Sequence, residues 1–314
     1  MLNLKNELKG AKSVAISGHI RPDGDCVGST MAVYLLVKKI MPECDVHIYL
    51  EDEPKLFSYI KDYDKIENPQ GVEKTFDVFV CLDTVKDRLG NAEGIFDKAL
   101  KKINIDHHMT NLGCGDVNYI VPDASSASEL VYNCIDEEDM DLDIATALFI
   151  GIIHDTGVLQ YSNTSVSTQR ATAKLISYGV EASMLIENTF YSKTYLQTQL
   201  LGRVLSESIL LCDGRVSVGH IDLKTSKFYN SRPKDYEGIV NQLKYIRGVD
   251  VAIFMYEQED HKYKVSLRSN EKVDVSVVSA YFGGGGHKRA SGVTMEGNFY
   301  DVVNNLTGEI VKQL

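Results

Sequence analysis

Acidic and imidazole side chains gather in four short segments of this sequence, each of which follows or ends an apolar run. The segments are GHIRPDGDCVGS (18–29), FDVFVCLDT (76–84), INIDHHMT (103–110) and FIGIIHDTG (149–157). The candidate residues in them are His19, Asp23, Asp25, Asp83, Asp106, His107, His108, His154 and Asp155. Carboxylates and imidazoles are the groups with which proteins bind divalent cations and transfer protons.

These carboxylates need a compensating positive charge if they meet in the fold. Ionised carboxylates repel one another, and Arg21 alone cannot balance four aspartates. Mixed carboxylate and imidazole ligands suit Mn²⁺ or a similar ion better than Ca²⁺, and no cysteine occupies a clear zinc-ligand position. Each motif alone also has a structural interpretation as a helix cap, a turn or a buried histidine, and His154 could simply support Asp155. Their joint occurrence favours two divalent cations.

Apolar runs and their spacing predict the elements that position these residues. Strands are expected at 13–17, 45–50, 76–83 and 101–106, and helices at 29–40, 125–130 and 143–157. Ser126 and Glu129 have the spacing of a capping box at the start of the second helix. Strands that alternate with helices indicate a parallel sheet with helices on both faces. The loops after the strands of such a sheet converge on one crevice, which would bring the four segments together.

The pattern changes near residue 190, where a second domain begins. A helical connector at 191–211 precedes strands at 215–223 and 262–269, with a helix at 236–246 between them. This indicates a smaller α+β domain. The predicted boundaries are 1–186 for the catalytic domain, 187–199 for a helical linker and 200–314 for the second domain, with the active site in the cleft between the domains. The acidic run 136–143 is expected to be a solvated loop with a helix start.

Composition narrows the function classes. The chain has 314 residues, of which 44% are hydrophobic, and a net charge of −11, which argues against a protein that coats long nucleic acid. No run approaches the roughly 18 apolar residues of a membrane helix, and the N-terminus does not read as a signal peptide. The 6 cysteines lack a CxxC pair and are expected to be reduced, which favours the cytoplasm.

The motifs HIRPDGD, CLD, DHH and HD resemble, in order and spacing, those of the DHH phosphoesterase family, over nearly the whole chain. FGGGGHKRASG (282–292) is similar to the glycine-rich signature of the DHH-associated C-terminal domain, and SLRSN (266–270) to its arginine-bearing strand. KRASG departs slightly from the usual pair of alanines before the glycine. With the chain length, the resemblance is to the NrnA type, small oligoribonucleases (nanoRNases) that also dephosphorylate 3′-phosphoadenosine 5′-phosphate (pAp).

The resemblance implies a role for each motif residue. His19, Asp23 and Asp83 would bind one cation, while Asp25, Asp83, His107 and Asp155 would bind the second, with Asp83 shared. His108 would face the scissile phosphate, Asp106 would orient the histidines, and these two with Asp83 form the expected catalytic set. Residues 262–290 contain six Lys or Arg and two acids, so their net charge is +4. The substrate-binding residues are expected to be Arg268, Gly284, Gly285, Gly286 and His287.

The implied function is hydrolysis of short RNA to mononucleotides and of pAp to AMP, with short oligonucleotides and nucleoside bisphosphates as partners and no membrane. One alternative is a phosphodiesterase for pApA or cyclic di-AMP. Another is a catalytically inactive nucleotide-binding module, which the intact motif residues argue against. A pyrophosphatase and a long-strand exonuclease of the RecJ type are disfavoured by the glycine-rich signature and by the short acidic chain. The sequence leaves the preferred substrate, the polarity of digestion and a homodimer open.

Overall fold

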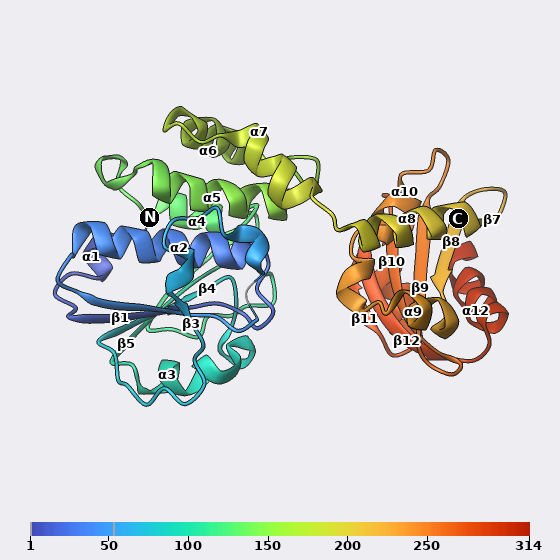
Figure 1. The fold of residues 1–314 in the computed structure, drawn as a ribbon, viewed down its shortest axis with the longest axis horizontal. Helices are drawn as coiled ribbons and strands as arrows, with labels where there is room; N and C mark the ends of the chain where they lie inside the picture. The colour runs from blue at the N-terminus through green and yellow to red at the C-terminus, as the bar shows by residue number, and fades with distance from the viewer. Residues whose placement is uncertain (1, 53) are drawn as a thin grey trace. The chain divides into compact units, whose positions relative to one another are not determined.

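A computed structural model describes residues 2–52 and 54–314. The chain folds as two compact units, Met1–Ser192 and Lys193–Leu314 (Figure 1). The helices within the described ranges include none that combines the length and the hydropathy of a membrane crossing.

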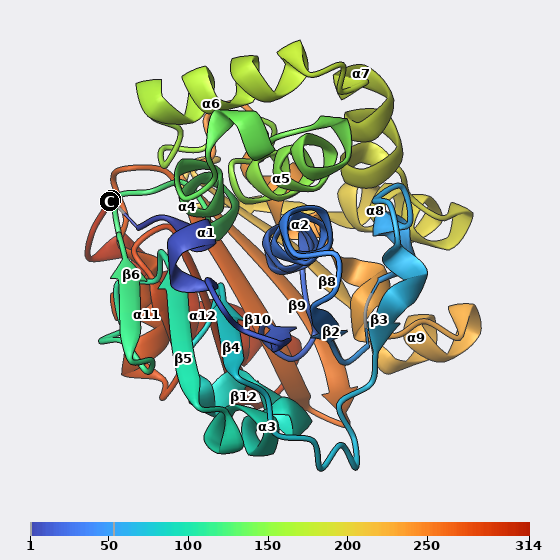
Figure 2. The ribbon, with the colours of Figure 1, turned by 90° about the vertical axis from the view of Figure 1, so that its left-hand side faces the viewer.

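The first unit is built on a six-stranded parallel sheet with the order β3-β2-β1-β4-β5-β6 (Figure 2). Its strands are β1 Ser13–Ser17, β2 Asp45–Tyr49, β3 Ile66–Glu67, β4 Val78–Leu82, β5 Lys101–Asp106 and β6 Val117–Ile120. Its α-helices are α1 Leu4–Glu7, α2 Gly24–Ile40, α3 Glu93–Lys98, α4 Ala127–Asn133, α5 Leu142–Asp155, α6 Val166–Ser177 and α7 Ala182–Leu185. Shorter turns are the 3₁₀ turns η1 Lys55–Phe57, η2 Tyr63–Lys65, η3 Lys86–Arg88, η4 Gly90–Ala92 and η5 Glu137–Asp139, and the π-helical turn η6 Ile186–Tyr191.

Helices cover both faces of this sheet, unequally. The larger layer contains α2, α4 and α5 (Figure 1). Their apolar side chains form one continuous core with Val14, Ile16, Val80 and Ile105 of the sheet. On the opposite face α3 packs a smaller cluster around Phe79. Strands β1 and β4 are buried throughout except for Ser13, as expected for parallel strands between two layers.

The second unit contains a mixed sheet with the order β11-β12-β10-β9-β8-β7. Its strands are β7 Ile209–Leu211, β8 Val216–Ile221, β9 Val251–Glu259, β10 Lys262–Ser269, β11 Gly285–His287 and β12 Ala290–Glu296. Its helices are α8 Tyr195–Glu207, α9 Leu223–Tyr229, α10 Ile239–Lys244, α11 Val275–Tyr281 and α12 Phe299–Val311, with a 3₁₀ turn η7 at Pro233–Tyr236.

Two separate cores cover the faces of this second sheet. Helices α8 and α10 pack on one face against Ala252 and Phe254 of β9. Helices α11 and α12 pack on the other face against Ile253 of β9 and against Val265 and Leu267 of β10. Successive side chains of a strand point to opposite faces of the sheet, so the neighbouring residues Ala252 and Ile253 of β9 contact different helix layers. The predicted fold class, a parallel α/β unit followed by a smaller α+β unit, is therefore confirmed.

Several predicted elements have different limits or surroundings in the structure. Helix α2 begins at Gly24, five residues before the predicted start, because Asp23 caps it. The acidic run 136–143 is a largely exposed segment that leads into α5, as predicted, and its carboxylates also pair with lysines from other segments. The pairs are Lys174–Glu137, Lys5–Glu138, Lys5–Asp139, Lys39–Asp141 and Lys61–Asp143.

Candidate metal centre and phosphate-binding surface

The candidate residues of the first unit meet at the carboxyl ends of β1, β4 and β5. The chain adds β2 and β3 on one side of β1 and β5 and β6 on the far side of β4, so the connections diverge between β1 and β4. Ligands of open parallel sheets bind at such a point of divergence. The sheet topology therefore explains why residues about 60 to 130 positions apart in the sequence share one site.

The loop after β1 holds His19 and Asp23 close together. His19 is 6% exposed, and its Nε2 lies 3.7 Å from Asp23 Oδ1 and 3.4 Å from Asp83 Oδ2. The side chain of Asp23 accepts hydrogen bonds from the backbone N–H groups of Asp25 and Cys26, both at 3.1 Å, and so caps α2. One turn of chain thus serves as a helix cap and as part of the candidate centre.

Asp25 is held by the N-terminus of α4. Its Oδ2 accepts from Ala127 N at 2.6 Å and its Oδ1 from Ser128 N at 2.9 Å. Helix α5 must approach closely here, since a Cβ on Gly151 would lie 1.9 Å from Ser128 Oγ and 2.9 Å from Asp25 Oδ1. A side chain at position 151 would therefore displace the carboxylate.

Asp83 follows β4 directly and carries two unusual features. Its φ of +55° is left-handed, which is uncommon for a residue with a Cβ. Its Oδ1 is buried and has no hydrogen-bond partner among the described residues, although His107 Nε2 and His108 Nδ1 lie 3.5 and 3.6 Å away. Buried carboxylate oxygens are normally satisfied, so an unpartnered one facing imidazole nitrogens fits a cation ligand.

The DHH segment after β5 is organised by the fully buried Asp106. Asp106 Oδ1 accepts from the backbone N–H groups of His107 at 2.8 Å and His108 at 3.2 Å, and lies 2.7 Å from His108 Nδ1. Its Oδ2 accepts from Asn111 Nδ2 at 2.5 Å. Asn111 was absent from the sequence-based set, although its position three residues after the DHH motif was a visible signal.

His107 lies at the meeting point of three carboxylates. Its Nε2 is 3.2 Å from Asp155 Oδ2, 3.5 Å from Asp83 Oδ1 and 4.0 Å from Asp25 Oδ2. The structure thus brings together all of the predicted metal ligands in two overlapping groups. One group joins His19, Asp23 and Asp83, and the other joins Asp25, Asp83, His107 and Asp155.

The pKa shifts of these residues reflect repulsion among the buried carboxylates, which lack sufficient positive charge nearby. Burial and the nearby Asp83 raise the pKa of Asp25 to about 7, and burial with Asp25 raises that of Asp155. Burial alone would lower the pKa of His107, but Asp83, Asp25 and Asp155 outweigh it and raise the value to about 10. The carboxylates therefore take protons or protonated imidazoles as partners, which divalent cations would replace.

Two neighbouring residues differ from the sequence-based expectation. His154 could support Asp155 on sequence grounds, but its side chain contacts other residues. Its Nε2 lies 3.1 Å from Thr189 Oγ1, and its ring packs edge-on against Phe57. Burial lowers the pKa of His154 to about 4. Cys26, expected to play no part, has a buried sulfur that can lie within 4.8 Å of a ligand atom of His19 and of Asp83. Burial raises the pKa of Cys26 to about 11, so it is present as the thiol.

The predicted substrate-binding residues lie in the second unit, on β10 and on or just before β11, which are separated by β12. Arg268 on β10 and His287 on β11 are both in register with Ala290 of β12, so their side chains share one face of the sheet. Two strand spacings separate them, which is about 10 Å. Gly285 is likewise in register with Gly292. The shared face thus carries cationic and imidazole groups around residues without side chains.

Two of the glycines are required by the backbone packing. A Cβ on Gly284 would lie 2.4 Å from Gly292 O, and one on Gly286 would lie 2.6 Å from Ala290 O. Lys244 of α10 was not predicted. Burial lowers its pKa, and the positive charges of the nearby Arg289 and Arg268 lower it further, so its amine lies close to both guanidinium groups. The concentration of positive charge suits a phosphate group.

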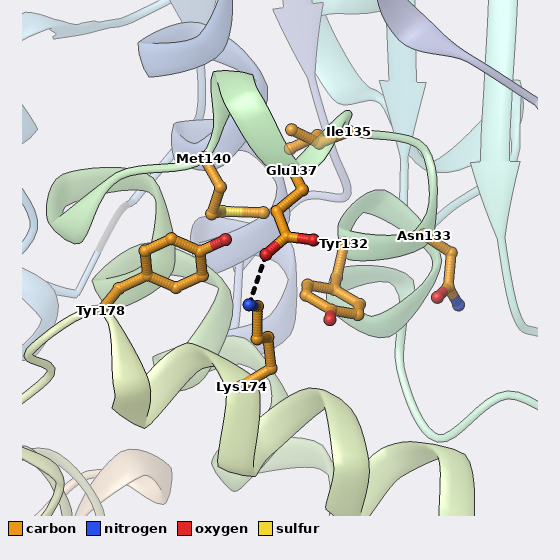
Figure 3. A pocket seen from close by; sticks show the side chains of 7 residues that line it. All are labelled: Tyr132, Asn133, Ile135, Glu137, Met140, Lys174 and Tyr178. Carbon is orange, nitrogen blue, oxygen red and sulfur yellow. Dashed lines mark hydrogen bonds and ion pairs between the residues drawn. The ribbon is translucent and has the colours of Figure 1, made fainter.

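A separate hollow lies at the C-terminal end of α4 (Figure 3). It is lined by Tyr132, Asn133, Ile135, Glu137, Met140, Lys174 and Tyr178. The Lys174–Glu137 ion pair joins two of its walls. Since the candidate centre contacts the opposite end of α4, at Ala127 and Ser128, this hollow is not part of it.

Comparison with known families identifies both units. Residues 13–152 match the N-terminal domain of the DHH family, and residues 221–313 match the DHHA1 domain. The chain thus contains a DHH-family N-terminal domain followed by a DHHA1 domain. The matched ranges contain every predicted site residue except Asp155, which lies three residues beyond the first match.

Two bacterial proteins with assigned functions resemble this chain along most of its length. The chain is 27% identical over 303 residues to the bifunctional oligoribonuclease and PAP phosphatase NrnA of Thermus thermophilus, covering 96% of this chain and 89% of the relative. It is 25% identical over 291 residues to the protein of the same name from Bacillus subtilis, covering 90% and 89%.

Solved structures share the fold of this DHH protein. An exopolyphosphatase-related protein from Bacteroides fragilis superposes with a TM-score of 0.88 at 23% identity, over 98% of this chain and 94% of the other. RecJ of Thermus thermophilus, solved in complex with Mn²⁺, gives a TM-score of 0.55 at 13% identity, over 98% of this chain and 54% of RecJ.

Proposed function

We propose that this protein is a metal-dependent phosphoesterase that hydrolyses short oligoribonucleotides to mononucleotides and pAp to AMP. The observation that carries the proposal is the buried, unpartnered Oδ1 of Asp83 at the junction of two groups of carboxylates and imidazoles. The names of the Thermus and Bacillus relatives, which match nearly the whole chain, support the choice of substrates.

The residues fit two divalent cations, for which we propose Mn²⁺. His19, Asp23 and Asp83 would hold one, and Asp25, Asp83, His107 and Asp155 would hold the other. Such cations lower the pKa of water and offset negative charge on phosphoryl oxygens. Nitrogen and carboxylate donors without an ionised thiol suit Mn²⁺ better than a soft metal.

The chain's own groups would orient the substrate beside this centre. Asp106 holds His108 through its backbone N–H and its ring nitrogen, which leaves the other ring nitrogen available to donate to a phosphoryl oxygen. The hydrogen bond to the Asp106 carboxylate raises the pKa of His108, which favours the protonated imidazole. The His108 side chain is 36% exposed, whereas that of the neighbouring Asp83 is 3% exposed, so His108 is accessible to a substrate.

The second unit would hold a phosphate that is not cleaved. Arg268 can form paired hydrogen bonds to such a group, and His287 on the same face can add another. The exposed backbone of Gly285 offers close approach, because no Cβ stands above it. Recognition of a second phosphate would explain a preference for pAp and for short 5′-phosphorylated RNA over monophosphates.

A substrate panel tests this function. The purified protein with Mn²⁺ is given pAp, pApA, cyclic di-AMP and RNA of two to about 25 nucleotides, and kcat/KM is ranked. We expect pAp and RNA of about two to four nucleotides to lead. A clear preference for pApA or cyclic di-AMP over RNA would move the assignment to the dinucleotide phosphodiesterases.

Efficiency should fall for longer RNA because of charge. The chain has a net charge of −11, so phosphates beyond those bound at the site meet net repulsion. This repulsion is least screened at low salt, so the decline with length should be steeper there. Equal kcat/KM for dimers and 25-mers at both salt concentrations would contradict the small-substrate assignment.

A further inference from the structure

Three ligands of the proposed second cation depend on one short segment, residues 124–128. The backbone N–H groups of Ala127 and Ser128 hold Asp25 at 2.6 and 2.9 Å. The carbonyl oxygen of Ala124 lies 3.4 Å from His107 Nδ1, which places His107 between this segment and the centre. The position of the segment therefore sets the position of two ligands directly.

The third ligand is linked to the same segment through Asn163. Its Nδ2 donates to Ser125 O at 2.9 Å and to Asp155 O at 3.1 Å, so it ties the end of α5 to the segment. None of the hydrogen bonds and ion pairs of His19, Asp23 or Asp83 within the described residues involves this segment. The segment thus belongs to one half of the centre.

One buried carboxylate, Glu129, fixes this segment. It is 3% exposed, and its Oε2 accepts from Ser125 N at 3.1 Å, from Ser125 Oγ at 2.6 Å and from Thr168 Oγ1 at 2.8 Å. Its Oε1 accepts from Ser167 Oγ at 2.7 Å. Four donors from the segment and from the first turn of α6 therefore converge on one side chain.

This arrangement differs from the capping box that the sequence predicted. Ser126 Oγ does accept from Glu129 N at 3.0 Å, which is one half of a capping box. The carboxylate of Glu129, however, reaches Ser125, one residue before the cap, and continues to α6. Such a connection joins the segment to a second helix, which a helix cap alone does not require.

We propose that Glu129 is a positioning residue for the second cation: it holds residues 124–128 against α6 and thereby places Asp25, His107 and Asp155. The inference rests on the two-cation centre of the proposed function. Removal of residues that orient metal ligands without contacting the metal themselves typically weakens metal affinity by about 10–100-fold. Loss of Glu129 should therefore weaken the second cation and spare the first.

The test is a titration of the full chain with Mn²⁺ in the absence of substrate. Binding is monitored by calorimetry and by electron paramagnetic resonance. The wild type should bind two ions per chain and show a spin-coupled pair. Glu129→Ala should bind the first ion within about threefold of the wild type and the second at least about tenfold more weakly, leaving an uncoupled Mn²⁺ signal. His107→Ala and His19→Ala are references for loss at the second and first positions.

Two further variants separate positioning from general damage. Glu129→Gln keeps an acceptor for Ser125 and should restore most of the second-ion affinity. Asp141→Ala removes the cap at the far end of α5, where Asp141 Oδ1 accepts from Ile144 N, and should lower the urea midpoint of unfolding without changing either affinity.

The outcomes distinguish this inference from the proposed function. Fewer than two ions on the wild type would overturn the two-cation centre itself. Equal weakening of both ions in Glu129→Ala, or wild-type affinity for the second, would overturn the role of Glu129 alone. If Glu129→Ala does not fold, Ser125→Ala decides, because it removes the 2.6 Å hydroxyl bond. It should weaken the second ion by at least threefold, and wild-type affinity would refute the proposal.

Discussion

Two buried aspartates, one in each unit, have opposite electrostatic surroundings. Asp25 in the first unit is 1% exposed, and its pKa is raised to about 7 by burial and by Asp83. Asp250 in the second unit is 4% exposed, and its pKa is lowered to about 2, because Asn270, Arg215 and Lys272 outweigh the effect of burial. Two carboxylates with similarly low solvent exposure thus have pKa shifts in opposite directions.

The difference lies in the partners that the chain supplies. Asp250 Oδ2 lies 2.7 Å from Arg215 Nε and its Oδ1 lies 3.0 Å from Lys272 Nζ, so the ionised carboxylate is satisfied within the fold. Asp25 has two backbone donors but faces further carboxylates. The first arrangement stabilises a fold, and the second leaves negative charge for an external cation. Burial of a carboxylate alone therefore does not indicate a cation site, whereas several buried carboxylates that face one another with too few protein cations do.

The largest expected effect is that of Asp83→Asn, which removes the carboxylate that both groups of ligands share, one oxygen facing His19 and the other facing His107. Activity with pAp should fall by at least about 10³-fold, since both proposed cations lose a ligand. The fold should persist, because asparagine tolerates the left-handed φ of +55° and relieves repulsion among the carboxylates. Steady-state kinetics and circular dichroism measure the two properties.

The matched control for this variant is Asp77→Asn at the other end of the same strand. Asp77 Oδ2 accepts from Lys12 N and Ser13 N at 2.7 and 3.1 Å, far from the centre along β4. This variant should keep its activity. Near-wild-type turnover of Asp83→Asn at saturating Mn²⁺ would refute the shared-ligand assignment.

A smaller effect on catalysis is expected in the second unit. Arg268→Ala should raise KM by about 10- to 150-fold, because the lost hydrogen bonds to a charged phosphate are worth roughly 1.5–3 kcal/mol. The amount of bound Mn²⁺ should stay constant. His287→Ala should act in the same direction. Arg203→Ala is the control, because Arg203 pairs with Glu207 within α8. A loss of bound metal with an unchanged KM would contradict the assignment of Arg268 to phosphate binding.

The paired aspartate should reveal itself in stability. Asp250→Asn should lower the free energy of unfolding at pH 7 by about 2 kcal/mol, in line with lost hydrogen bonds to a charged group. The folded pKa lies below the unfolded one, so this stabilisation is complete above about pH 4 and is lost as the pH falls toward 2. Urea unfolding at pH 7 and pH 3 should show the difference between variant and wild type shrinking. A constant difference would contradict the paired, ionised state.

The sequence predicted which residues meet at the candidate centre, because each motif ends a buried strand or helix. Asp83 and Asp106 stand at the carboxyl ends of β4 and β5, where sheet topology alone brings them together. The parallel sheet could be predicted for the same reason, since its strands are apolar and alternate with helices.

Other features of the site could not be predicted because they depend on contacts between distant segments. The bond from Ala127 N to Asp25 spans 102 positions, and nothing near Asp25 in the sequence signals it. Glu129 has the spacing of a capping box, and only the packing of α6 directs its carboxylate elsewhere. The predicted boundaries of the linker and the cleft between the units remain predictions.

The smallest expected effect concerns strain beside the centre. Gly157, Val158 and Leu159 have φ values of +56°, +58° and +64°, so three consecutive residues after Asp155 are left-handed. Such a φ costs a residue with a Cβ about 1–2 kcal/mol, and a β-branched valine is among the least suited. The turn persists because Thr156 O accepts from Gln160 N and Tyr161 N, both at 2.9 Å.

Val158→Asn should therefore stabilise the protein by about 1 kcal/mol, since asparagine adopts this backbone region more readily than valine. Val277→Asn, at an exposed position of α11 in the second unit, is the control. Valine and asparagine have similar helix propensities, so it should change stability by less than about 0.5 kcal/mol. Urea midpoints of the metal-free proteins measure both. Destabilisation by Val158→Asn would show that the valine side chain contributes more through packing than its backbone costs, and that the first unit stores no relievable strain beside its centre.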